Sequence, residues 1–157
     1  MNQTYMKEKK IFPLVMSMAL PMMLSMAFNS LYNIVDSYFV AKLSEDAMTA
    51  LSLVYPAQNL LTAVAVGFGV GVNAMISFYL GAQNQEKADK TATQGIVLGV
   101  LHGVLLMLLF LCGMNWFLGM FTKSDAVRAL GMEYSNVVFL FSVIVTGGIT
   151  LEKIFQA

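Results

Sequence analysis

A long run of uncharged residues, from Ile11 to Val35, ends in a single carboxylate at Asp36. About twenty apolar residues are enough for a helix to cross the hydrocarbon core of a membrane. The run therefore predicts a long, tilted transmembrane helix with Asp36 in its second half. Further uncharged runs follow from Ala47 to Gln85, from Thr91 to Thr122 and from Tyr134 to Leu151.

The four runs predict an all-α fold, a polytopic bundle of four transmembrane helices at about residues 12–42, 47–80, 91–118 and 131–152. Composition agrees, because hydrophobic residues make up 58% of the sequence and charged residues only 11%. Mean hydropathy is +0.71, and a soluble domain carries about 25% charged residues. This composition predicts membrane lipid as the surroundings of the chain. The formal net charge is zero, so we expect no nucleic-acid partner.

Basic residues predict the orientation of the bundle, because cytoplasmic loops are enriched in Lys and Arg. Four spans with a cytoplasmic start leave both ends of the chain in the cytoplasm, as a multi-pass protein of the cell (plasma) membrane. Every basic residue is expected in a terminus or a loop. Those inside are Lys7, Lys9, Lys10, Lys87, Lys90 and Lys153, and those outside are Lys42, Lys123 and Arg128.

Polar residues of the first run recur at steps of three or four, which places them along one face of a helix. They are Ser17, Pro21, Ser25, Asn29, Tyr32, Asn33 and Asp36. Lipid cannot solvate such a face, so it should lie against other helices or a wet cavity. Pro21 removes the backbone bond to the carbonyl of Ser17, and either a hinge or a fixed kink would result.

The other runs also carry polar or small residues at helical spacing. In the second run, Gly67, Gly69 and Gly71 are expected to let a neighbouring helix approach closely, and Gly81 to end the helix in a left-handed conformation. His102 in the third run would either relay protons or link two helices. Tyr55, Asn59, Thr62, Gly69 and Asn73 form one such stripe, with Gln58 beside it, and Ser135, Ser142, Thr146 and Thr150 form another.

Several segments together carry a family resemblance. They are Ala19-Leu20-Pro21, LYNIVDSYFVAKL from Leu31, the Ala-rich Ala47 to Leu53 before Pro56, VGFGVGVNAMISFYLGAQNQEKA from Val66, and Ser124-Asp125-Ala126-Val127 before Tyr134. In this order they resemble the amino-terminal part of a multidrug and toxic compound extrusion (MATE) family transporter. The resemblance implies two six-helix lobes with a cavity, of which this chain supplies an incomplete amino-terminal lobe. The remaining helices of the full-length transporter would then be its partners.

The resemblance also implies a membrane antiporter that exports cationic drugs or organic cations in exchange for protons or sodium ions. A carboxylate in a low-dielectric environment favours its neutral form, so Asp36 would bind a proton, a sodium ion or a cationic substrate in turn. Asn29, Tyr32 and Asn33 would orient the carboxylate or complete an oxygen shell, with Tyr55, Asn59 and Asn73 as facing partners. The plain alternative is a hydrated Asp at the outer interface. We expect no catalytic residue, no cofactor and no metal other than Na⁺ at Asp36.

Other function classes leave different signatures. An intramembrane enzyme is disfavoured, because the sequence has no Gly-x-Ser-x-Gly element, His-rich metal spacing or paired carboxylate. A lipid or polysaccharide flippase of related architecture should place Lys or Arg in its cavity to bind anionic head groups. A small dimeric four-helix multidrug transporter would also carry one acid in its first helix, but should be shorter. A purely structural subunit gives no reason for a buried carboxylate.

Overall fold

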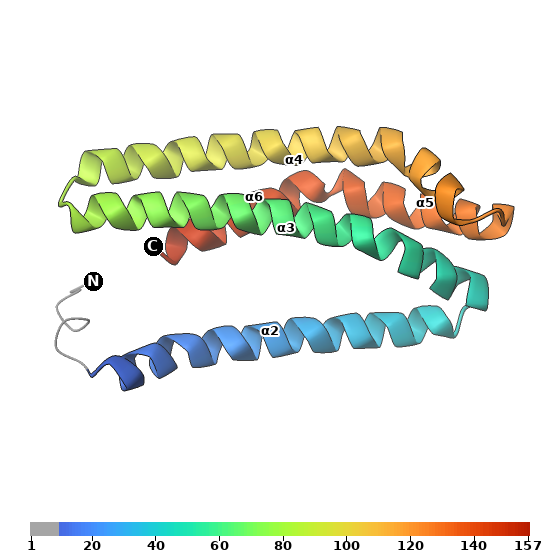
Figure 1. Cartoon of the computed structure of the whole chain (residues 1–157), viewed down its shortest axis with the longest axis horizontal. Helices are drawn as coiled ribbons and strands as arrows, with labels where there is room; N and C mark the ends of the chain where they lie inside the picture. The colour runs from blue at the N-terminus through green and yellow to red at the C-terminus, as the bar shows by residue number, and fades with distance from the viewer. Residues whose placement is uncertain (1–9) are drawn as a thin grey trace. The chain divides into compact units, whose positions relative to one another are not determined.

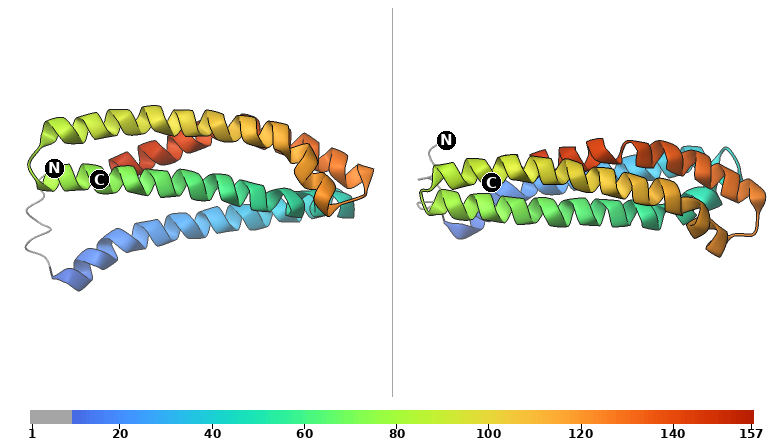
Figure 2. Two further views of the ribbon diagram at one scale, coloured as in Figure 1. Left: turned by 45° about the horizontal axis from the view of Figure 1, so that its top comes forward. Right: turned by 90° about the horizontal axis from the view of Figure 1, so that it is seen from above.

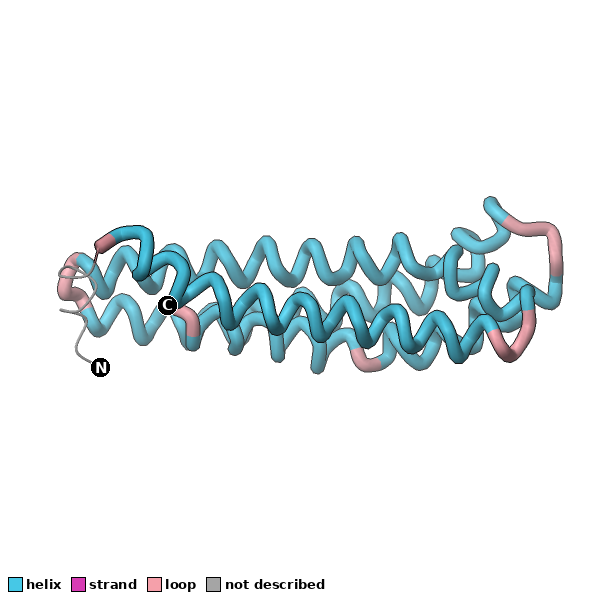
Figure 3. Tube along the Cα trace, turned by 90° about the horizontal axis from the view of Figure 1, so that it is seen from below, coloured by secondary structure: helices cyan, strands magenta, loops and turns pink. Residues whose placement is uncertain are grey.

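The computed structural model describes the chain from Lys10 to Ala157, without the side chains of Met18, Met22 and Asn29. The basic residues Lys7 and Lys9 lie outside the described part. Helices joined by short turns make up this part, which contains no strand (Figure 3). It divides into two compact units, one ending at Ser44 and one from Glu45 to Ala157. The helices are α2 (Ile11–Ala41), α3 (Glu45–Gly81), α4 (Gln85–Phe121), α5 (Asp125–Leu140) and α6 (Ser142–Phe155).

Helix α2 of the first unit is continuous through Pro21 (Figure 1). Serine hydroxyls on the helix donate to its own carbonyls, Ser17 Oγ to Leu14 at 2.7 Å and Ser25 Oγ to Pro21 at 3.1 Å. These bonds satisfy small polar groups within the helix, so they need no partner in lipid. The helix has the length and hydropathy of a membrane span, as the sequence predicts.

In the second unit, α3 and α4 run antiparallel side by side (Figures 1 and 2). Each has 37 residues, which is about 55 Å at 1.5 Å per residue. The hydrocarbon core of a membrane is about 30 Å thick. The ends of both helices therefore project into the head-group regions.

The turn between α3 and α4 differs from the sequence-based expectation. Gly81 lies in the last turn of α3 without a positive φ, and the one left-handed non-glycine residue of the described part is Gln83, at φ 56°. Asn84 then caps α4, because its Oδ1 accepts from the backbone N–H of Lys87 at 3.1 Å. The cap starts α4 at Gln85 rather than near residue 91, so Lys87 and Lys90 lie in a helix and not in a loop.

The expected fourth span consists of two helices. Helices α5 and α6 meet at Phe141 with a bend of 45°, and the described part therefore has three candidate spans, or four if the bent pair is one. Ser124 caps α5, since its hydroxyl accepts from Val127 N–H at 3.4 Å. Arg128 on α5 donates to the Asn115 side chain at 2.9 Å and ties the start of α5 to the end of α4.

Apolar side chains from α3, α4 and α5 form the main core of the second unit. The rings of Phe110 and Phe139 stack at 4.4 Å in this core. Helix α6 packs instead through small polar residues that are completely buried, namely Ser142, Thr146 and Thr150. Their hydroxyls donate to backbone carbonyls at 2.7–2.9 Å, so each polar group is satisfied.

Glycines on α4 make room for α6. A Cβ at Gly99 would lie 2.5 Å from Thr150 Oγ1, and one at Gly103 would overlap Thr146 Oγ1. Close approach of this kind is how membrane helices gain packing energy without a hydrophobic driving force. Among the described residues, the predicted close approach of a neighbouring helix to the α3 glycines occurs at Gly69, whereas a Cβ added at Gly67 or Gly71 would have no atom within 4 Å.

Candidate functional site

Asp36 is the only charged residue of α2. Tyr32 lies one turn before it on the same face of the helix, at a spacing of four residues, and Asn33 lies at a spacing of three. Tyr32 and Asn33 are exposed and Asp36 is half-buried. The side chain of Asn29 is outside the described part, although its helical position places it on the same face. The unbroken helix thus supports the predicted polar stripe.

The candidate residues on α3 separate into two groups. Tyr55 and Asn59 are exposed, one turn apart, while Ala57 and Leu61 between and after them are buried in the core. An exposed asparagine side chain is costly in hydrocarbon, so this face of α3 requires a polar partner or water. Tyr55 and Asn59 therefore stay candidates for a binding surface, and neither contributes to packing of the core.

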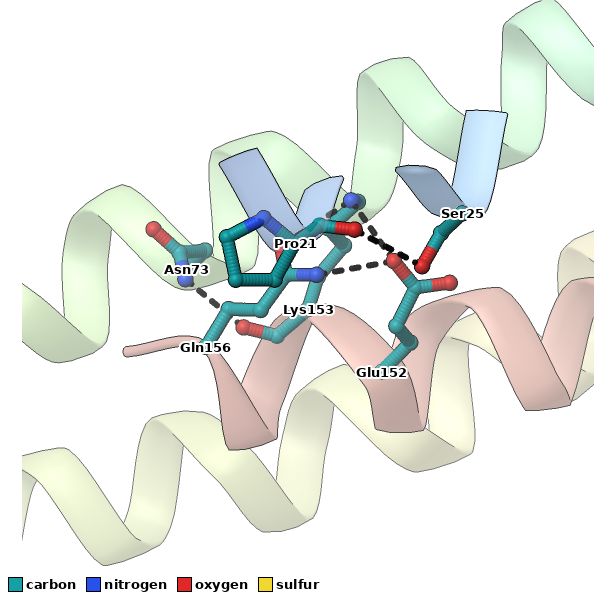
Figure 4. A network of polar contacts seen from close by, with 6 residues as sticks. All are labelled: Pro21, Ser25, Asn73, Glu152, Lys153 and Gln156. Atoms are coloured by element: carbon teal, nitrogen blue, oxygen red, sulfur yellow. Dashed lines mark hydrogen bonds and ion pairs between the residues drawn. The ribbon is translucent and has the colours of Figure 1, made fainter. Parts of the chain in front are cut away.

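Asn73 belongs to a different environment. Its Nδ2 donates to the backbone carbonyl of Lys153 at 2.7 Å, which connects α3 to the last turn of α6 (Figure 4). The last carbonyls of a helix lack intrahelical partners, so this bond satisfies a helix end. Gln58 makes a comparable connection, from its Nε2 to the hydroxyl of Tyr134 at 3.2 Å. The sequence reveals these polar residues but not their partners.

A polar cluster at the end of α6 is not predicted by the sequence analysis. Lys153 Nζ lies 3.0 Å from Glu152 Oε1 and 3.0 Å from Gln156 Oε1, and Gln156 Nε2 donates to Glu152 at 2.8 Å (Figure 4). The Lys153 side chain is only 19% exposed, and its Cγ lies 2.9 Å from a Cβ placed on Gly69. The expectation that every basic residue lies in a loop or terminus is therefore wrong for Lys153, as it is for Lys87, Lys90 and Arg128, which also lie in helices. The spacing of four between Glu152 and Gln156 is the signal that could have revealed the cluster.

His102 connects α4 to α3 through its ring. The imidazole stacks on Phe68 with ring centroids 4.7 Å apart, and Nδ1 lies 2.8 Å from the carbonyl of Leu98 on its own helix. His102 therefore links two helices, as one of the two sequence-based alternatives predicts. The link is a ring contact and not a hydrogen bond between the helices. The proton-relay alternative stays a prediction.

The described residues offer few charged or imidazole ligands for a metal ion, because no three His, Cys, Asp or Glu side chains lie close together there. A hard cation such as Na⁺ at Asp36 would therefore need neutral oxygen ligands beside the carboxylate. Amide, hydroxyl and backbone carbonyl oxygens of the polar stripe are ligands of this kind.

Comparison with known proteins identifies the family. The MatE family profile matches residues 21–157. The chain is 28% identical over 154 residues to the multidrug export protein MepA of Staphylococcus aureus (strain NCTC 8325 / PS 47), covering 98% of this chain and 34% of MepA. MepA of Staphylococcus haemolyticus (strain JCSC1435) is 27% identical over the same length. The chain thus spans about a third of the length of these relatives.

Solved structures share the fold. One is an outward-facing multidrug resistance MATE family transporter of the MOP superfamily, with a TM-score of 0.83, 26% identity, and coverage of 87% of this chain and 30% of that one. Another, with the same values, is a MOP superfamily transporter from Pyrococcus furiosus, whose reversed binding-pocket polarity is said to suggest a different function. With a family match over most of its length and transporter structures as neighbours, this helical membrane chain belongs to the MatE family of transporters.

Proposed function

We propose that the protein exports cationic drugs or other organic cations across the plasma membrane in exchange for protons or sodium ions. Drug export is supported by the family and by MepA, which is named a multidrug export protein. The exchange itself rests on a physical argument about Asp36. The single observation that carries it is one carboxylate on an otherwise uncharged helix, with polar side chains one turn away.

In the proposed cycle the Asp36 carboxylate binds either the coupling ion or the cationic substrate, never both. Entry of a proton or sodium ion from outside neutralises the carboxylate and releases the substrate. Carrying an uncompensated charge through hydrocarbon is costly, so only neutralised states change their access. Asn29, Tyr32 and Asn33 orient the carboxylate, Tyr55 and Asn59 contribute to the substrate surface, and Pro21 lets α2 bend between the two states.

The test is gradient-driven efflux of a cationic dye from vesicles that contain the complete gene product. Asp36→Asn keeps the size of the side chain but cannot bind a proton or balance a cation, and we expect export to fall at least about tenfold. Asp89→Asn is the matched control, because Asp89 is exposed on α4 and its carboxylate accepts a bond from Gln85 on the same helix. Undiminished export by Asp36→Asn would remove Asp36 from the mechanism.

A lipid or polysaccharide flippase is the second candidate, and Lys153 is the observation that favours it. A basic side chain in a membrane helix is what a site for anionic head groups requires, and the Lys153 side chain is only 19% exposed. However, Lys153 is paired with Glu152 at 3.0 Å, and such a neutral pair attracts an anion weakly. Translocation of an anionic lipid by the Asp36→Asn variant would favour the flippase. The small dimeric four-helix transporter receives no support from the family match.

A further inference from the structure

Two neighbouring hollows between α3 and α4, together called the groove, differ in lining, one polar and the other mainly apolar. The first, of about 340 Å³, lies beside the α3–α4 turn and is lined by Tyr79, Glu86, Lys87 and Lys90 among others. The second, of about 480 Å³, lies farther along the helices and is lined mainly by apolar residues and glycines. Thr91 and Gln94 line both hollows, which makes them neighbours.

The polar end of this groove carries the charges of the region. Lys87 and Lys90 are exposed on the first turns of α4, and Lys87 Nζ lies 5.7 Å from the centre of the Tyr79 ring. Glu86 also lines the hollow and lowers its net positive charge. An aromatic ring and two ammonium groups at the end of a membrane helix are suited to the phosphate layer of a lipid.

The apolar end is open because two glycines form part of its wall. Nothing lies within 4 Å of the Cβ position at Gly67 or Gly71, so no side chain of the described protein fills this space. Phe68, Val72 and Met75 supply apolar walls. From Tyr79 to Gly67 the groove follows α3 for about 18 Å, at 1.5 Å per residue, which is comparable with the roughly 15 Å depth of hydrocarbon in one leaflet.

We propose that this groove binds an anionic phospholipid of the leaflet next to the α3–α4 turn, with its phosphate at Lys87 and Lys90 and an acyl chain over Gly67 and Gly71. Charge complementarity selects the head group, and the change from polar to apolar lining selects a lipid over a free ion. Asp36 is not among the residues of the groove, and the inference does not depend on what the protein exports. Under the predicted topology the leaflet is the cytoplasmic one.

The test uses quenching of tryptophan fluorescence by lipids with brominated acyl chains, in vesicles that contain the complete gene product. Met75→Trp places the fluorophore in the groove, in a background where Trp116 and any other tryptophan of the complete gene product are replaced by Phe. We expect brominated phosphatidylglycerol to quench it more strongly than brominated phosphatidylcholine at equal mole fraction. The double variant Lys87→Gln, Lys90→Gln should lower this preference at least about fivefold, and Glu86→Gln should raise it.

Matched controls act at the other end of the same helices. The native Trp116 is exposed near the end of α4 and should report no comparable preference, and Lys123→Gln should leave the preference in the groove unchanged. Gly71→Leu adds a side chain at a position where nothing lies within 4 Å of the added Cβ, so it should occupy part of the groove and reduce the preference.

Three results would overturn the proposal. Equal quenching by the two lipids, or a preference that survives the double lysine variant, would show that the lysines select no head group. A preference unaffected by Gly71→Leu would mean that the polar hollow binds phosphate without an acyl chain in the groove. An introduced tryptophan that neither lipid quenches, while Trp116 is quenched, would mean that another protein helix covers the groove.

Discussion

At the scale of single residues, the lack of a side chain at Gly103 on α4 should determine how closely α6 packs. A Cβ at Gly103 would lie 2.8 Å from the backbone Cα of Val143 and overlap the Thr146 hydroxyl. Backbone cannot move aside cheaply, so we expect Gly103→Ala to destabilise the protein by about 1–3 kcal/mol. Thermal unfolding of the complete gene product in detergent measures the effect. Gly71→Ala is the control, and equal melting temperatures for the two variants would contradict the packing described here.

Residue identity predicts polarity better than it predicts partners. The sequence marks Asn73 as a polar group facing inward, but its acceptor is the Lys153 carbonyl, 80 positions away in sequence. Lys153 itself is expected in a terminus, because a lysine beside a glutamate at the end of an apolar run is normally solvated. Only the close approach of α6 to Gly69 reveals that its methylene groups are packed. Such contacts depend on tertiary structure and leave no local pattern.

At the scale of helices, the two prolines inside spans provide a direct comparison. Pro21 lies in α2 and Pro56 in α3, and each removes one backbone hydrogen bond. If α2 bends at Pro21 during transport, Pro21→Ala should restore the bond, stiffen the helix and slow dye export about tenfold, with little loss of stability. Pro56→Ala should slow export much less, because the flanking Val54 and Ala57 hold α3 in the core. Similar export rates for the two variants would contradict a hinge at Pro21.

Helix bounds are predictable where local signals set them. The expected spans at about 12–42 and 47–80 agree closely with α2 and α3, since hydropathy and length are properties of short stretches. The break at Phe141 is not predictable, because no proline or glycine stands there. It coincides with the Ser142 hydroxyl, which lies 3.4 Å from the Gly103 carbonyl of α4. The same hydroxyl donates to the Phe139 carbonyl at 2.7 Å, so a local bond and a contact with a neighbouring helix both lie at the break.

At the scale of the whole chain, the sequence carries the membrane class, the helical fold and the family, because all three depend on patterns that extend over many residues. The candidate site is predictable only in part. The stripe around Asp36 follows from helical spacing, whereas the groove over Gly67 and Gly71 requires knowing that α6 packs on Gly69 and leaves the other two glycines uncovered. Glycine spacing alone predicts close packing at all three positions.

The orientation of the chain in the membrane underlies both the direction of exchange at Asp36 and the leaflet of the lipid groove. Lys87 and Lys90 begin α4, whereas Lys123 precedes α5 at the other end of the same helix pair. The positive-inside rule places the first two in the cytoplasm. In a background where Cys112 and any other cysteine of the complete gene product are replaced by Ser, a membrane-impermeant maleimide should therefore label Lys123→Cys in intact cells. It should label Gln83→Cys only after the cells are opened. Labelling of Gln83→Cys in intact cells would show the opposite orientation in the membrane. The groove would then lie in the outer leaflet, and Asp36 in the cytoplasmic half of its helix.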